Sequence, residues 1–167
     1  LLGLVSAGPG EAQERRLGTL SFPNSGAPGA QNDFIQGVLL LHSFEYADAA
    51  AAFRRAQEID PDFALAYWGE AMTYNHPIWG EYDGDAARAV LTRYHGTPAT
   101  EREALYWAAM DPLYRDEISD KTERDQAYMV AMRRLHEAYP DDDEASAFYA
   151  LSILGLTNGV RDFRNYM

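Results

Sequence analysis

The fold of this chain is decided by residues 37–61, which read GVLLLHSFEYADAAAAFRRAQEIDP. Apolar side chains recur at helical spacing in the first part, and the alanine-rich second part predicts another helix over about 48–59. Pro61 ends that helix, because the residue before a proline is disfavoured in helical backbone. Gly37 lets two antiparallel helices approach closely, and we expect Phe53 to be a buried plug between them.

The same kind of pattern continues on the C-terminal side of this stretch. Helical apolar spacing alternates with capping residues and prolines, which punctuate helices in a predictable way. Helices are expected over 63–74, from Asp83 or Asp85 to about His95, from Thr97 and Pro98 to about Met110, from Ser119 or Asp120 to Tyr139, and from Asp142 onward. The run Asp141-Asp142-Asp143-Glu144 lacks the spacing of a calcium loop and is interpreted as the N-terminal cap of the last of these helices.

The spacing within the deciding stretch is that of a known repeat. With residue 30 as the first repeat position, five residues fall on the small, aromatic and proline positions of a repeat about 34 residues long: Gly37, Ala49, Phe53, Ala56 and Pro61. The pattern resembles the tetratricopeptide (TPR) repeat. Three phrases also resemble bacterial exported TPR proteins of unassigned function: Leu41-His42-Ser43-Phe44, Ala66-Tyr67-Trp68-Gly69 and Asn75-His76-Pro77-Ile78-Trp79. The resemblance extends from about residue 17 onward and implies an all-α solenoid of antiparallel helix pairs.

The prolines give the number of units. Pro61, Pro98 and Pro140 lie 37 and 42 residues apart, and the extra residues over a repeat of about 34 fit the turn at 77–80 and the stretch 111–118. This predicts about three and a half units. The fourth ends before its second helix, so we expect the chain to be a fragment.

The two ends of the chain are interpreted differently from its middle. Residues 1–7 resemble the end of a signal peptide, which favours an exported, periplasmic protein; a tag-like start of a cytosolic protein is the alternative. Residues 8–31 are rich in proline and glycine and predict an extended lead-in, while 32–167 form the TPR-like domain, truncated at its C-terminus. After residue 7 nothing approaches the ~20 apolar residues of a membrane span.

Composition excludes several functions. The chain has no cysteine, which rules out disulfides, thiolate metal sites and a cysteine nucleophile. The net charge of −12 argues against binding nucleic acid. The arginine pairs 54–55 and 133–134 are assigned to the C-terminal parts of helices, where cations favour the helix dipole. Nucleophile elbows, phosphate-binding loops and dinucleotide fingerprints are absent from the sequence, which makes an enzyme the less favoured interpretation.

His42 and His76 form one candidate site. They lie 34 residues apart and so occupy the same place in successive first helices. Two neutral imidazoles brought close can ligate Zn or Cu, with Glu45 or Asn75 as further ligands. Alternatively, both are packed histidines near helix ends that hydrogen-bond backbone carbonyls. A metal-binding or metal-dependent protein is therefore the second functional hypothesis.

Aromatic residues suggest the leading hypothesis, which is a protein or peptide partner without catalysis. Five residues on a first helix and its following loop are predicted to form the partner-binding groove: Met72, Tyr74, Asn75, Trp79 and Tyr82. Trp68 and Trp107 are assigned to the core. TPR domains that clasp a terminal carboxylate use Lys, Arg and Asn on their first helices, and here only Asn75 matches. The resemblance therefore implies an apolar or aromatic groove for a helix or an extended peptide.

Overall fold

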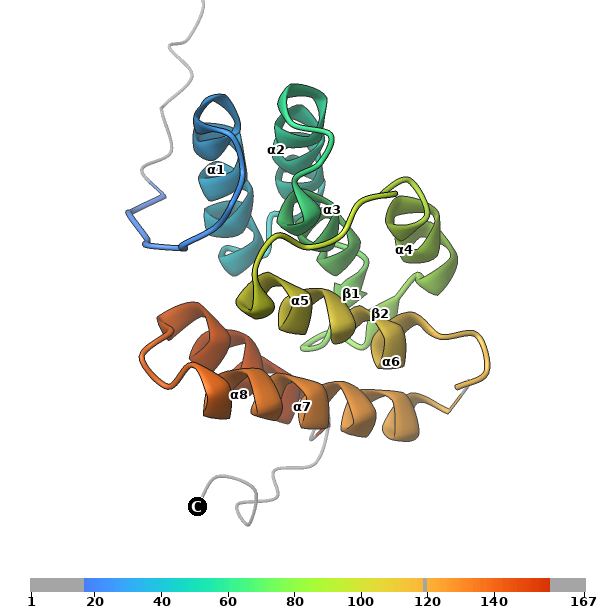
Figure 1. The fold of residues 1–167 in the computed structure, drawn as a ribbon. Helices are drawn as coiled ribbons and strands as arrows, with labels where there is room; N and C mark the ends of the chain where they lie inside the picture. The colour runs from blue at the N-terminus through green and yellow to red at the C-terminus, as the bar shows by residue number, and fades with distance from the viewer. Residues whose placement is uncertain (1–16, 119, 157–167) are drawn as a thin grey trace, which may run out of the picture.

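The computed structural model describes residues 17–118 and 120–156 (Figure 1). Residues 1–7, the predicted signal-peptide remnant, and the start of the lead-in lie outside the described residues. The elements in chain order are η1 (Pro28–Ala30), α1 (Gln31–His42), α2 (Tyr46–Ile59), α3 (Ala64–Met72), β1 (Asn75–His76), β2 (Glu81–Tyr82), α4 (Gly84–Leu91), α5 (Glu101–Ala108), α6 (Met110–Tyr114), α7 (Lys121–Ala138) and α8 (Asp143–Leu156). Apart from one short hairpin, in which β1 pairs antiparallel with β2, the regular structure of this part of the chain is helical.

The helices pack as successive neighbours. Helix α1 packs on α2, α2 on α3, α3 on α4, and α7 on both α6 and α8. Figure 1 shows α1 and α2 side by side and α7 and α8 paired at the opposite end of the molecule. The all-α prediction with packed helix pairs is therefore confirmed. No helix within 17–118 and 120–156 is long and apolar enough to cross a membrane.

Phe53 is the plug that the sequence predicts. Its side chain is fully buried in α2 and lies between a glycine of α1 and a glycine of α3. A Cβ atom at Gly37 would lie 2.7 Å from Phe53 Cε1, and one at Gly69 would lie 2.3 Å from the same atom. Only hydrogen fits at either position, so both glycines are required by the close approach of the ring.

Side chains at three helix starts fix the boundaries. Asp83 accepts a hydrogen bond from the backbone N–H of Ala86, and Asp120 caps α7 in the same way. The expected start at Thr97 and Pro98 is wrong, because α5 begins at Glu101 with Thr100 as its cap. Thr100 is the cap because its side-chain oxygen accepts a hydrogen bond from the backbone N–H of Glu103, three residues later.

Two further helix boundaries differ from expectation. Helix α4 ends at Leu91 instead of near His95. The loop expected from Asp111 begins later, because Met110–Tyr114 form α6. Pro112 is tolerated there, since the N–H that proline lacks would have no partner in the first turn of a helix.

The lead-in belongs to the core, which the sequence pattern did not predict. Phe22 has no regular secondary structure around it, yet its ring is buried against the rings of Phe34, Trp68 and Tyr106 at centroid distances of 5.3, 5.9 and 5.3 Å. The N–H and hydroxyl of Ser25 donate hydrogen bonds of 2.6 and 2.8 Å to the buried carboxylate of Glu103. The segment is therefore held by both apolar packing and hydrogen bonds.

Helix α8 returns to α1 and α3. The Phe148 ring lies 5.0 Å from the ring of Trp68 in α3 and 5.3 Å from that of His42 in α1. Many side chains of α1 and α3 are buried, among them Phe34, Val38, Leu41, the predicted core residue Trp68 and the predicted groove residue Met72.

Candidate apolar binding site

Four of the five predicted groove residues line two adjoining pockets, and the fifth, Trp79, lies beside them. Met72 and Asn75 line a cavity of about 230 Å³, which we call the apolar pocket. Tyr74 and Tyr82 line a second cavity of about 530 Å³, which we call the polar pocket. Trp79 lies in the loop between β1 and β2 and is 55% exposed. The structure thus places all five in one region, although Met72 is buried and forms only the floor.

Three elements that are distant in sequence build the apolar pocket. The end of α1 with the turn after it, the end of α3 with the loop after β1, and α8 each contribute apolar side chains. The main ones are Leu41, Phe44, Met72, Ile78, Phe148 and Leu154. The loop and α8 are in close contact, since a Cβ at Gly155 would lie 3.0 Å from that of Pro77. At one side of the pocket, His42 Nε2 is hydrogen-bonded to Glu144 Oε2 at 2.6 Å and ties α1 to α8.

Exposed apolar side chains gather around this pocket. Five large hydrophobic residues are exposed in the described part of the chain, and four of them line it or adjoin it: Phe44 at 39%, Ile78 at 42%, Leu154 at 44% and Trp79 at 55%. The ring of Trp79 packs edge-on against that of Phe44 at 5.0 Å. Apolar side chains that cluster on a surface, rather than scatter singly, mark interaction sites.

The backbone of Phe44 is held in an unfavourable conformation. Its N–H donates to the carbonyl of Leu41 at 3.0 Å, and the N–H of Glu45 donates to that of Leu40 at 2.9 Å. This is the Schellman pattern that ends many helices, in which the residue after the C-cap takes left-handed backbone and is usually glycine. Phe44 has a φ of 61°. A side chain costs about 1–2 kcal/mol there, and such strain gathers at functional sites.

This strain gives a testable difference between two variants. We expect Phe44→Gly to have a free energy of unfolding about 1 kcal/mol higher than that of Phe44→Ala. Both variants lose the ring, but only glycine adopts left-handed backbone without a Cβ clash. Chemical denaturation of the two proteins measures the difference. Equal stabilities, or a more stable alanine variant, would contradict strain at this position.

The polar pocket adjoins the apolar one through Tyr46, which lines both. The Tyr46 ring stacks on the imidazole of His76 with a centroid distance of 3.7 Å and an interplanar angle of 14°. Burial, and to a smaller extent the charge of Glu81, raises the pKa of Tyr46 to about 12. The phenol is therefore neutral at physiological pH and contributes an uncharged ring to the wall between the pockets.

The two histidines of the metal hypothesis have separate partners. His42 is bound to Glu144, whereas His76 Nδ1 lies 2.7 Å from Glu81 Oε2 and His76 Nε2 lies 2.9 Å from the carbonyl oxygen of Thr73. The expected hydrogen bond to a backbone carbonyl is thus confirmed for His76. No group of three His, Asp or Glu residues placed to hold a metal ion occurs within 17–118 and 120–156. The zinc or copper site therefore gains no support from this arrangement.

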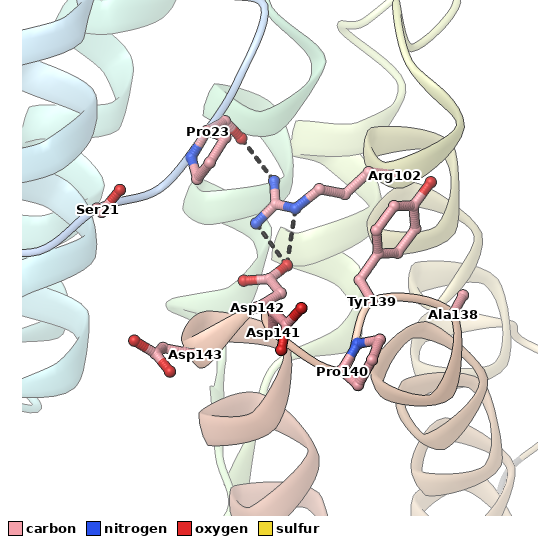
Figure 2. A pocket seen from close by; sticks show the side chains of 9 residues that line it. All are labelled: Ser21, Pro23, Arg102, Ala138, Tyr139, Pro140, Asp141, Asp142 and Asp143. Atoms are coloured by element: carbon pink, nitrogen blue, oxygen red, sulfur yellow. Dashed lines mark hydrogen bonds and ion pairs between the residues drawn. The ribbon is translucent and has the colours of Figure 1, made fainter.

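A third cavity, of about 450 Å³, lies between the lead-in and the turn from α7 to α8 (Figure 2). Figure 2 shows Arg102 between Pro23 and Asp142; its guanidinium donates to the Pro23 carbonyl at 2.6 Å and to the Asp142 carboxylate at 2.7 Å. The other carboxylate oxygen of Asp142 accepts from the N–H groups of Glu144 and Ala145, which confirms the predicted cap. Arg102 and Asp142 therefore connect the lead-in, α5 and the start of α8, which is a structural role.

Arg54 and Arg55 also have a different role from the expected one. They lie in the middle of α2 and not in its last turn. Arg54 Nε donates to Glu70 Oε1 of α3 at 2.7 Å, and Arg55 Nε donates to Asp33 Oδ1 of α1 at 2.6 Å. The assignment to the helix dipole is therefore wrong for this pair, because both guanidinium groups reach acidic side chains of neighbouring helices.

Sequence reasoning missed Phe44 and Leu154 as parts of the site. For Phe44 a local signal existed, since a bulky residue stands directly after a helix end where glycine is usual. Leu154 had none, because it reaches the pocket only through the return of α8.

Comparison of the chain with protein-family models, with curated proteins and with solved structures finds no match to any of them, so its function has to be argued from these residues alone.

Proposed function

We propose that this chain is a TPR-like helical-repeat scaffold that binds a peptide segment of a partner protein, without catalysis, by taking an apolar side chain into the apolar pocket. The observation that carries the proposal is the gathering of four exposed large hydrophobic side chains around one cavity in a chain of net charge −12. Burying such a cluster against a partner removes apolar surface from water, which is the main driving force of association.

The repeat assignment in this proposal is supported by Phe53. Its contacts with Gly37 and Gly69 connect the first helices of two successive units through the second helix of the first unit. The chemistry of the pocket supports binding over catalysis, because most of its lining consists of Leu, Ile, Met, Pro and Phe side chains that offer burial. The imidazole of the lining, that of His42, is engaged by Glu144 in the contact that ties α1 to α8. An exported, periplasmic location is the part of the proposal that depends on residues 1–7.

Trp79 provides the test of this proposal. Ten-residue random peptides displayed on phage are selected on the whole chain, and the affinities of the recovered peptides are measured for Trp79→Ala. We expect a loss of tenfold or more, because exposed tryptophans at the centre of an interface contribute strongly to affinity. Met72 is less suited than in the sequence-based prediction, since it is buried and its replacement would also cost stability.

Ile59→Ala is the matched control. Ile59 is 50% exposed, close to the 55% of Trp79, but it lies at the other end of α2 from Tyr46. Thirteen residues of helix separate the two ends by about 20 Å. Affinities within twofold of the unmodified chain are expected for this variant. Failure to recover any peptide, or peptides that bind Trp79→Ala as well as the unmodified chain, would refute the proposed site.

A further inference from the structure

The charge and aromatic content of the polar pocket indicate the chemistry of the bound segment. Two carboxylates line this pocket, Glu81 and Asp83, and the Glu81 side chain is 72% exposed. Glu81 also pairs with His76, and Asp83 caps α4 through one of its oxygens. Both carboxylates have further capacity to accept hydrogen bonds, since each ionised carboxylate offers about four lone-pair sites.

One cation lines the same pocket, and its charge is already compensated. Arg54 donates to the buried carboxylate of Glu70 at 2.7 Å and to the hydroxyl of Tyr74 at 3.1 Å. The ring of Tyr74 completes the lining on this side, whereas the ring of Tyr82 already has the guanidinium carbon of Arg124 at 3.9 Å from its centroid. Trp79 lies two residues before Glu81, and its ring contacts that of Tyr46. Carboxylates beside aromatic rings are the groups that hold a Lys or Arg side chain.

The two pockets share Tyr46, so one short segment reaches both. On the basis of the proposed function, we infer that the bound segment carries a large apolar residue for the apolar pocket and, close to it in sequence, a Lys or Arg that lies over the polar pocket against Glu81 and Asp83. The net charge of the whole chain also favours a basic segment, because a charge of −12 attracts basic peptides and repels acidic ones.

A second copy of this chain is a poorer occupant for the same reason. Two copies would bring together surfaces of the same negative sign, and like charges facing each other oppose association. Sedimentation of the chain alone tests this point. A dimer that Trp79→Ala dissociates would show that another copy covers the pocket, and it would overturn the assignment of a basic segment.

The decisive experiment removes the two charges and keeps the shapes. In Glu81→Gln/Asp83→Asn, glutamine retains the length of the side chain at 81, and asparagine is as good a helix cap as aspartate. The matched control is Glu58→Gln/Asp62→Asn, which removes two exposed carboxylates near the other end of α2. Peptides selected on the unmodified chain are sequenced and their affinities measured for both variants at low and high salt.

We expect the selected peptides to be enriched in Lys or Arg within a few positions of an apolar residue. Their affinity is expected to fall about three- to tenfold at low salt in the double variant of the pocket and to be unchanged in the control, with a smaller difference at high salt. A peptide whose basic residue is replaced by Gln should bind the unmodified chain and the pocket variant equally.

The possible failures are distinguishable. If apolar peptides are selected without basic enrichment, or if the pocket variant binds basic peptides normally while Trp79→Ala does not, the charge assignment is refuted and the proposed function stands. If no selected peptide depends on Trp79, the proposed function itself fails.

Discussion

Replacing Phe53 with alanine is expected to lower the free energy of unfolding by about 3–5 kcal/mol, which is the range for a fully buried phenylalanine. The ring is 0% exposed and is enclosed by the glycines of two other helices. Gly37 and Gly69 have no side chains that can move into the space left by the ring, so the cavity persists and adds to the lost transfer free energy. Equilibrium denaturation in urea measures the loss.

The same substitution at Phe44 provides the control for Phe53. Phe44 is 39% exposed, so Phe44→Ala removes a ring that is only partly withdrawn from water. Its cost is expected to be well below that of Phe53→Ala. A loss under about 1 kcal/mol at Phe53 would mean that the ring does not fill the space between α1, α2 and α3, and it would remove the main support for the repeat register.

Replacing Phe22 with alanine is expected to be the second largest destabilisation, about 3 kcal/mol. The ring is 4% exposed, touches three other aromatic rings and lies 4.6 Å from the guanidinium carbon of Arg102. Its loss opens a cavity at the centre of the aromatic cluster. Because the ring belongs to a segment without helix or strand, part of the effect is expected as local release of residues 17–27.

Two measurements check this expectation for Phe22. Urea denaturation gives the global loss, and limited proteolysis gives the rate of cleavage within residues 17–27, which should increase. Ser21→Ala is the control, because Ser21 is exposed and its replacement should change stability by less than about 0.5 kcal/mol. If Phe22→Ala behaves like Ser21→Ala in both measurements, the lead-in is not part of the core.

The two buried phenylalanines show which core residues can be predicted from the sequence and which cannot. Phe53 was predictable because it lies in an alanine-rich helical pattern with a small residue sixteen positions earlier and a proline eight positions later. All these signals come from two adjacent helices, and short-range periodicity specifies how such helices face each other. Phe22 gave no comparable signal, since it stands among prolines and glycines without apolar periodicity.

The candidate site was predictable in part. Aromatic residues are concentrated between Met72 and Tyr82, in a turn between two helices, and this pattern points to a region in which four of the five predicted residues line the pockets. Phe44 and the α8 residue Leu154 were missed. Their positions depend on how the turn after α1 and the last helix meet the hairpin, and these contacts join residues more than a hundred positions apart.

Residues close along the chain specify every helix except α6, most of the helix caps and the packing of Phe53 between neighbouring helices, so these features can be predicted from local sequence. The tertiary structure alone decided that α8 returns to α1 and α3, that Phe22 enters the core, and that Phe44, Ile78, Trp79 and Leu154 surround one cavity. The physical reason is that helical periodicity shows which face of a segment is apolar, whereas the partner of that face is chosen by the shape and burial of the whole assembled chain.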